Sequence, residues 1–116
     1  MINWGKAMDS AHAQETISEM VRRIVERFHP EKIILFGSYA RGTAGPDSDV
    51  DLLVVLPIEG SKHDKVVEIR CQLSGMGLAK DVIVATPEEV EKYHDVPGTI
   101  IWPAAREGRV LYERTA

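Results

Sequence analysis

Residues 32–56 of the 116-residue chain read KIILFGSYARGTAGPDSDVDLLVVL, and the other segments are predicted to pack around this region. The apolar run over 33–36 has the length and β-branched content of a buried strand. Residues 39–42 could form one helical turn after a Gly-Ser pair, and a polar loop rich in turn-forming residues follows. Residues 49–55 are predicted to form a second strand, whose first half carries two acids.

These two acids, Asp49 and Asp51, are two residues apart, so their side chains are expected on the same face of the strand. Neighbouring carboxylates repel each other, and such a pair tends to retain a proton unless a cation neutralises it. Hard oxygen ligands suit Mg²⁺ or Mn²⁺. Gly37 and Ser38 end the first strand, where main-chain N–H groups of the following turn can hold an anion. The pattern therefore predicts a metal site facing a phosphate-binding turn.

The spacing Gly37-Ser38, ten residues, Asp49-x-Asp51 resembles the G-S-x10-D-x-D signature of the polymerase-β-type nucleotidyltransferase superfamily. The small size and the sequence Gly-Ser-Tyr-Ala-Arg-Gly most resemble its minimal nucleotidyltransferase (MNT) branch. Many members of that branch are antitoxins paired with HEPN-domain toxins. The resemblance implies a small mixed β-sheet with helices packed on one side of it.

The remaining elements are predicted from apolar periodicity and from helix start and stop signals. They are an arm containing Trp4, a helix from Asp9 or Ser10 to Phe28, a helix over 63–74, a strand over 80–85, a helix from Pro87 to about His94, a helix over 99–107 and a strand over 109–112. Helices and strands alternate, which places the fold in the α/β or α+β class. The relative direction of the first two strands stays open.

Length and composition indicate one domain over residues 1–116 with one core. The formal net charge of -4 argues against a surface that coats nucleic acid. The single cysteine, Cys71, allows no internal disulfide and is expected to pack as a small apolar side chain. No apolar run approaches a membrane span and the N-terminus lacks a signal-peptide pattern, so a cytoplasmic location is expected.

Three residues near the first strand are candidates for nucleotide binding. The resemblance makes Ser38 a phosphate ligand and makes Gly37 the position that allows the triphosphate to approach the main chain. Ser38 could equally cap the following helical turn. Arg41, three residues further, would lie on the same side of that turn, where its guanidinium suits phosphate oxygens. The alternative for Arg41 is an ordinary solvated side chain.

Asp81 opens the third predicted strand and is the candidate third carboxylate of the site. Two-metal catalysis of an in-line displacement needs carboxylates from neighbouring strands. In the family arrangement, Asp49 and Asp51 bind both ions or the triphosphate-bound ion, and Asp81 binds the catalytic ion and helps to take the proton of the acceptor.

Other motifs fail on residue counts. Thr43 occupies the lysine position of a P-loop, and Leu52 and Ile58 occupy the glycine and glutamate positions of a calcium loop. No histidine has a cysteine or histidine partner at zinc spacing, and all are expected at the surface; they are His12, His29, His63 and His94. Trp102 and Tyr112 are expected in the core, with a partner surface as the alternative.

The predicted function is Mg²⁺-dependent nucleotidyl transfer from a nucleoside triphosphate. The resemblance to MNT antitoxins implies ATP as donor and a tyrosine of a HEPN toxin as acceptor, which the added AMP would inactivate. Two alternatives remain. The chain could be a non-catalytic antitoxin that acts by direct binding, or a nucleotidyltransferase that modifies a small molecule.

Overall fold

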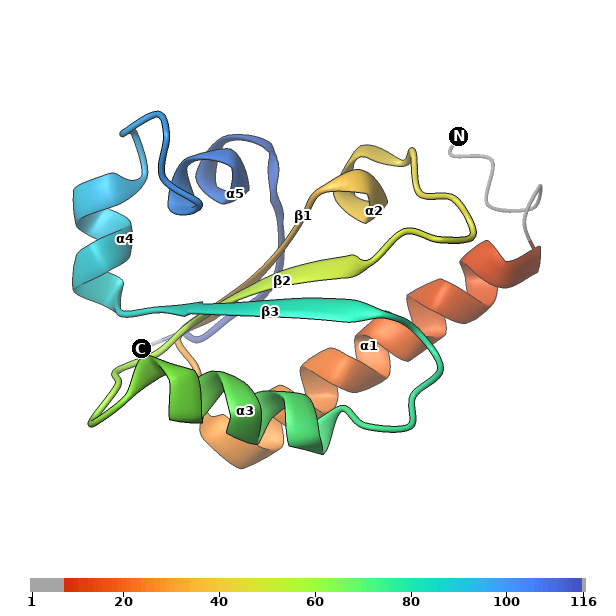
Figure 1. Ribbon diagram of the computed structural model, residues 1–116, viewed down its shortest axis with the longest axis horizontal. Coiled ribbons are helices and arrows are strands. Elements are labelled where there is room, and N and C mark those ends of the chain that lie inside the picture. The colour runs from red at the N-terminus through yellow and green to blue at the C-terminus, as the bar shows by residue number, and fades with distance from the viewer. Residues whose placement is uncertain (1–7, 116) are drawn as a thin grey trace.

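The computed structural model describes residues 8–115, with side chains from residue 12 onward. The predicted arm with Trp4 lies outside these residues. The elements in chain order are α1 (Met8–Phe28), β1 (Lys32–Phe36), α2 (Ser38–Arg41), β2 (Val50–Val55), α3 (Lys62–Gln72), β3 (Lys80–Ala85), α4 (Pro87–Tyr93), α5 (Ile101–Glu107) and β4 (Arg109–Glu113) (Figure 1). Each predicted helix and strand is present, with ends shifted by one or two residues. No helix within this range is long and apolar enough to cross a membrane.

The four strands form one mixed sheet in the order β3-β2-β1-β4. β1 runs antiparallel to both β2 and β4, which settles the direction that the sequence left open. β2 and β3 are parallel, and α3 makes the crossover between them. The predicted mixed α/β architecture is confirmed.

One face of the sheet is covered by α1 and α3, which lie below the strands in Figure 1. Apolar residues at steps of three and four along α1 bury Ile17, Met20 and Ile24 against this face. Ile69 of α3 and Leu73, directly after α3, are buried there too. These side chains meet the inward residues of β1, β2 and β3 in one core cluster. Burial of such side chains stabilises the fold by roughly 1.5–3 kcal/mol each.

The opposite face is covered as well, by α4 and α5, which lie above the sheet in Figure 1. Ile101 and Ala104 of α5 pack there on Phe36 of β1 and Leu53 of β2. The prediction that helices pack on one side only is therefore wrong. Strands buried on both faces carry continuous apolar runs instead of alternating polar residues, and both central strands have such runs.

Helix ends follow the predicted chemistry at two places. α1 ends at Phe28, and His29 adopts a positive φ of 50° before Pro30. α4 begins with a capping box, in which the Thr86 side chain accepts from the Glu89 N–H and the Glu89 carboxylate accepts from the Thr86 N–H.

Cys71 is exposed, so the prediction that it packs in the core is wrong. It lies two residues from both Ile69 and Leu73, which places it on the far side of α3 from the buried stripe. Trp102 and Tyr112 are half-buried, so the core prediction for them is met only in part. Arg106 lies over the Trp102 ring, 5.4 Å from its centroid. The four histidines are exposed, as predicted.

Candidate active site

Gly37 follows β1 directly, and its backbone conformation is one that only glycine adopts readily. Its φ of 76° and ψ of -156° lie in the region that side chains disfavour by roughly 1–3 kcal/mol. A Cβ built at this position would lie 2.1 Å from the Asp51 Oδ2 atom. Glycine suits this position because the backbone has a positive φ and because the carboxylate of Asp51 rests against the Gly37 main chain.

The short helix α2 starts from this glycine. The Gly37 carbonyl accepts hydrogen bonds from the Ala40 and Arg41 N–H groups, both at 3.1 Å. Gly37 occupies the N-cap position and no side chain caps the helix, so the alternative of Ser38 as the cap is wrong. Tyr39 is buried in the core below and anchors the turn. Ser38 is left half-buried at the first position of α2, with its hydroxyl not used in capping.

Asp51 and Asp81 are direct neighbours across the parallel β2–β3 pair. Asp51 also pairs with Phe36 of β1, the residue before Gly37. Residues in register across a sheet project from the same face. The end of β1 and the beginnings of β2 and β3 therefore present a row: the Gly37 turn, then Asp51, then Asp81. Asp51 is half-buried in this row, whereas Asp81 is exposed on the edge strand β3.

Asp49 is exposed and immediately precedes β2. It lines a hollow of about 600 Å³ together with residues from the C-terminal half of α3 and the start of β3. Within the described residues, no three carboxylate, histidine or cysteine side chains gather closely enough to hold a metal ion. The three acids thus share one end of the sheet, but their side chains do not converge.

The electrostatics of Asp51 reflect this crowding of acids. Burial raises the pKa of the Asp51 carboxyl above its usual range, and the charges of Asp81 and then Asp49 raise it further. Arg41 acts in the opposite direction and lowers that pKa. Arg41, the last residue of α2, is therefore near enough to Asp51 to offset part of the repulsion from the other acids.

We predict that Asp51→Asn stabilises the protein measured without metal, by roughly 1 kcal/mol or less after solvent screening. Because the folded pKa of Asp51 is raised, the folded protein keeps a proton that the unfolded chain has released, and the free energy of unfolding falls as pH rises through that interval. The gain in stability of Asp51→Asn should therefore be full at neutral pH and vanish at a pH below the usual pKa range of carboxyl groups. Thermal melts at pH 7 and at such an acidic pH measure it. Asp95→Asn, at an exposed acid after α4, is the control. A lower melting temperature for Asp51→Asn at pH 7 would contradict this account.

The donor chemistry of the row suits a hard divalent cation. Carboxylate oxygens are the ligands that Mg²⁺ and Mn²⁺ prefer, and a bound cation would relieve the repulsion that raises the pKa of Asp51. Asp49 and Asp81 are both exposed, so their side chains can change rotamer without disturbing the core. The residues present therefore fit such an ion.

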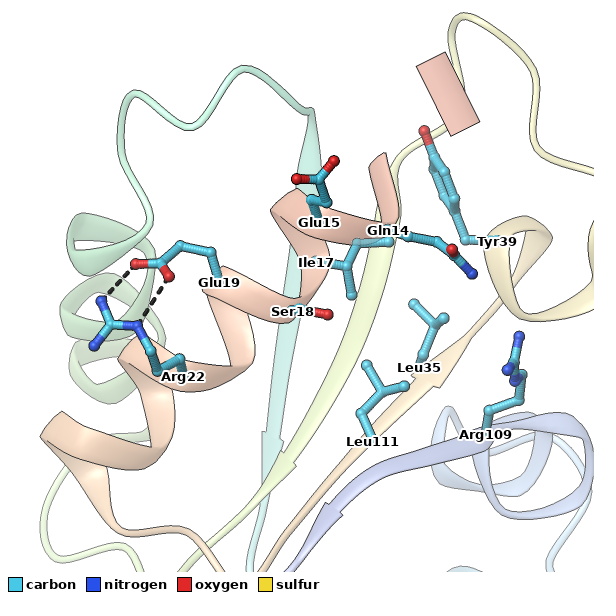
Figure 2. Close-up of a pocket in the computed structure, with 10 residues that line it drawn as sticks. All are labelled: Gln14, Glu15, Ile17, Ser18, Glu19, Arg22, Leu35, Tyr39, Arg109 and Leu111. Carbon is cyan, nitrogen blue, oxygen red and sulfur yellow. Dashed lines mark hydrogen bonds and ion pairs between the residues drawn. The ribbon is translucent and has the colours of Figure 1, made fainter. Parts of the chain in front are cut away.

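A larger hollow, about 800 Å³, lies between α1 and the edge strand β4, away from the row of acids. Figure 2 shows Leu35 and Leu111, from neighbouring strands, on its floor facing Ile17 of α1. The ion pair between Glu19 and Arg22 closes one side of it. None of the candidate carboxylates lines this hollow, and of the motif region only Leu35 and Tyr39 contribute to it. The chemistry is therefore assigned to the end of the sheet that carries the acids instead of to this hollow.

Two basic residues at this end of the molecule were not singled out by the sequence. Arg70 and Lys80 line the hollow beside Asp49. Lys80 carried a signal, since it directly precedes Asp81, but Arg70 lies on a helix whose approach to Asp49 depends on the crossover geometry. The candidate residues predicted from the sequence all lie at this end of the sheet; they are Gly37, Ser38, Arg41, Asp49, Asp51 and Asp81.

Comparison with known proteins identifies the class. Residues 17–102 match the family described as nucleotidyltransferase domain, and the chain belongs to it. The chain is thus a nucleotidyltransferase with a four-stranded mixed sheet.

Two relatives from Methanocaldococcus jannaschii are each named as a putative protein adenylyltransferase. The first is 34% identical over 106 residues, which cover 85% of this chain and 97% of the relative. The second is 46% identical over 50 residues, which cover 41% of this chain and only 34% of the relative.

Two crystal structures share the fold at lower identity. One, named as a putative nucleotidyltransferase from Sulfolobus solfataricus, has a TM-score of 0.62 at 22% identity, over 86% of this chain and 79% of that one. The other, a toxin–antitoxin structure with AMP-PNP, has a TM-score of 0.58 at 18% identity, over 84% and 73%.

Proposed function

We propose that this nucleotidyltransferase transfers AMP from ATP to a hydroxyl group of a partner protein, with a divalent cation held by Asp49, Asp51 and Asp81. The observation that carries the proposal is the row formed by Gly37, Asp51 and Asp81 across three adjacent strands. It brings a main-chain turn without a side chain next to two carboxylates in register.

In the proposed reaction, the acceptor oxygen attacks the α-phosphorus of ATP. The bond from that phosphorus to the oxygen bridging the β-phosphate breaks, and pyrophosphate leaves with the electron pair. A divalent cation, when bound, supplies charge neutralisation at the phosphate oxygens. Gly37 lets the triphosphate approach the main chain. Ser38 donates a hydrogen bond from its hydroxyl group to a phosphate oxygen, and the Arg41 guanidinium forms an ion pair with the phosphates. Asp81 accepts the proton of the attacking hydroxyl.

The partner is proposed from the names of similar proteins. The relatives are named as acting on protein, and one structure of the same fold comes from a toxin–antitoxin pair with an ATP analogue. Together with the resemblance to MNT antitoxins, this supports a HEPN-type toxin as the proposed partner and one of its tyrosines as the acceptor. We also propose Mg²⁺ as the ion and a cytoplasmic location, where both ATP and Mg²⁺ occur.

The test uses ATP labelled at either the α- or the γ-phosphate, with Mg²⁺ and the partner toxin. AMP transfer leaves α-label on the toxin and releases γ-label as pyrophosphate. Label on the toxin from γ-labelled ATP would mean phosphoryl transfer. α-Label that leaves ATP without reaching the toxin would favour the small-molecule alternative.

A second prediction concerns nucleotide and metal without any acceptor. Mg²⁺ with ATP should raise the melting temperature, and saturation at about 100 times the dissociation constant stabilises by about 2.7 kcal/mol. The double change Asp49→Asn/Asp51→Asn should abolish this increase because it removes two of the three proposed carboxylate ligands. Differential scanning fluorimetry with and without Mg²⁺ measures it. An undiminished shift in the double variant would place the metal site elsewhere.

A further inference from the structure

The hollow between α1 and β4 has the size and lining of a binding site for a small molecule with an aliphatic body. Its volume of about 800 Å³ lies within the range of small-ligand pockets. The aliphatic side chains of Ile17, Leu35 and Leu111 meet at its floor (Figure 2). Among the described residues that line it, Tyr39 alone is aromatic. The floor therefore suits an aliphatic chain.

Arg109 places a positive charge at one end of this hollow. Its side chain is exposed and forms no ion pair within residues 12–115, whereas Arg22, the other cation among the described lining residues, is paired with Glu19 and Glu26. In Figure 2, Arg109 and the Glu19–Arg22 pair lie at opposite ends, with the aliphatic floor between them. The Glu15 carboxylate points away from that floor. Because a guanidinium can donate two parallel hydrogen bonds to a carboxylate, the hollow favours a chain that ends in a carboxylate.

A protein partner would need a wider apolar surface than this hollow offers, since stable interfaces bury about 800 Å² on each partner. The large exposed apolar residues of the described chain do not line the hollow; they are Val67, Val96, Ile100 and Val110. Val110 is next to two lining residues in sequence, but it pairs with Ile34, which packs in the core cluster on the opposite face of the sheet. The hollow therefore suits a small molecule better than another protein.

Tyr39 connects the hollow to the turn that is proposed to hold the phosphates. It follows Ser38 directly and is the buried residue of α2. Since α2 is a single turn without a side-chain cap, the packing of Tyr39 in the core helps to fix Ser38 beside Gly37. The Tyr39 ring also lines the hollow, and its hydroxyl group points away from the floor in Figure 2. A ligand that packs against this ring would therefore hold the turn in place.

We propose that the hollow between α1 and β4 binds a small aliphatic carboxylate, with the carboxylate on Arg109, and that the bound ligand strengthens ATP binding through Tyr39. The coupling to ATP rests on the proposed function, whereas binding in the hollow does not. Coupling between two binding sites is reciprocal, so ATP should raise the affinity for the carboxylate by the same factor.

The first test measures binding of octanoate by calorimetry in the absence of ATP. The protein has a formal net charge of -4, so attraction by overall charge alone would favour octylammonium. We expect the opposite order, with octanoate bound more tightly than octylammonium or octanol. Arg109→Gln should weaken octanoate binding by roughly three- to tenfold. Ser18→Trp, at an exposed position of the α1 wall, should fill the hollow and abolish binding without disturbing the core.

The matched control for the charge is Arg27→Gln. Arg27 is exposed on α1, does not line the hollow and forms no ion pair with a residue of the described chain. This variant should bind octanoate like the wild type. Octylammonium that binds as tightly as octanoate would overturn the site. So would an octanoate affinity that is unchanged in Arg109→Gln or in Ser18→Trp.

The second test measures the coupling to ATP. Saturating octanoate should raise the affinity for ATP with Mg²⁺ by about fivefold or more. Tyr39→Leu should remove this increase, whereas Tyr39→Phe should keep it, because the hydroxyl group points away from the floor. Octanoate that binds at Arg109 without changing the affinity for ATP would overturn the coupling. A protein that binds octanoate in the expected order but binds no ATP would support the carboxylate site and contradict the proposed function.

Discussion

Asp81→Ala is expected to reduce AMP transfer to the proposed partner toxin by roughly a hundred- to a thousandfold, because the loss of one preorganised electrostatic group at a reacting centre costs this much. Asp81 is the group proposed to accept the proton of the attacking hydroxyl, and it lies beside Asp51 across the β2–β3 pair. The loss should appear in the rate of transfer, while the affinity for ATP, which we propose is held mainly at Gly37 and Ser38, changes little. Mass spectrometry of the toxin, purified after expression with each variant, measures the added AMP.

The melting temperature of Asp81→Ala shows whether a loss of transfer comes from the chemistry or from unfolding. Asp81 is exposed and its charge raises the pKa of Asp51, so its removal should leave the melting temperature unchanged or higher. Asp95→Ala, at an exposed acid after α4, is the matched control and should transfer AMP normally. Unmodified toxin that is still neutralised by the Asp81→Ala variant would contradict the proposed AMP transfer and support a non-catalytic antitoxin that acts by direct binding.

The central strands were predictable because their apolar runs and the motif between them agree. The continuous runs also carried the signal that both faces of the sheet are buried. The expectation of helices on one side came from the resemblance, and it failed where α5 packs Ile101 and Ala104 onto the second face. In this case the local pattern was the better guide.

The contact between Gly37 and the Asp51 carboxylate could not be predicted from the sequence. The motif places the two residues in one site, but their contact depends on the register in which Asp51 pairs with Phe36. That register needs the antiparallel direction of β1 and β2, which the sequence left open. The side-chain positions of Asp49 and Asp81 are equally a matter of tertiary geometry, whereas the position of Cys71 off the apolar stripe of α3 could have been read from its spacing.

Gly37→Val is expected to produce the second large effect, the loss of measurable nucleotide binding. The backbone at Gly37 has a φ of 76°, and a β-branched side chain there is strained by roughly 1–3 kcal/mol. Its Cβ would also displace the Asp51 carboxylate, since the two atoms would be 2.1 Å apart. One substitution therefore strains the turn proposed to hold the triphosphate and moves a proposed metal ligand. Ser38→Ala removes one contact only and should cost less. Calorimetric titration with ATP and Mg²⁺ on folded variants measures both.

Two other glycines separate the causes. Gly98 has a φ of 94° with no atom near its built Cβ, so Gly98→Ala introduces strain without a collision. Gly45 has neither strain nor a neighbour, so Gly45→Ala should leave stability and binding unchanged. Gly37→Ala should destabilise more than Gly98→Ala, and the excess should disappear when Asp51 is also replaced by alanine, because the two residues are then no longer coupled. An excess that persists without the Asp51 carboxylate would show that the collision is not the cause, and unchanged ATP affinity in Gly37→Val would remove Gly37 from the phosphate site.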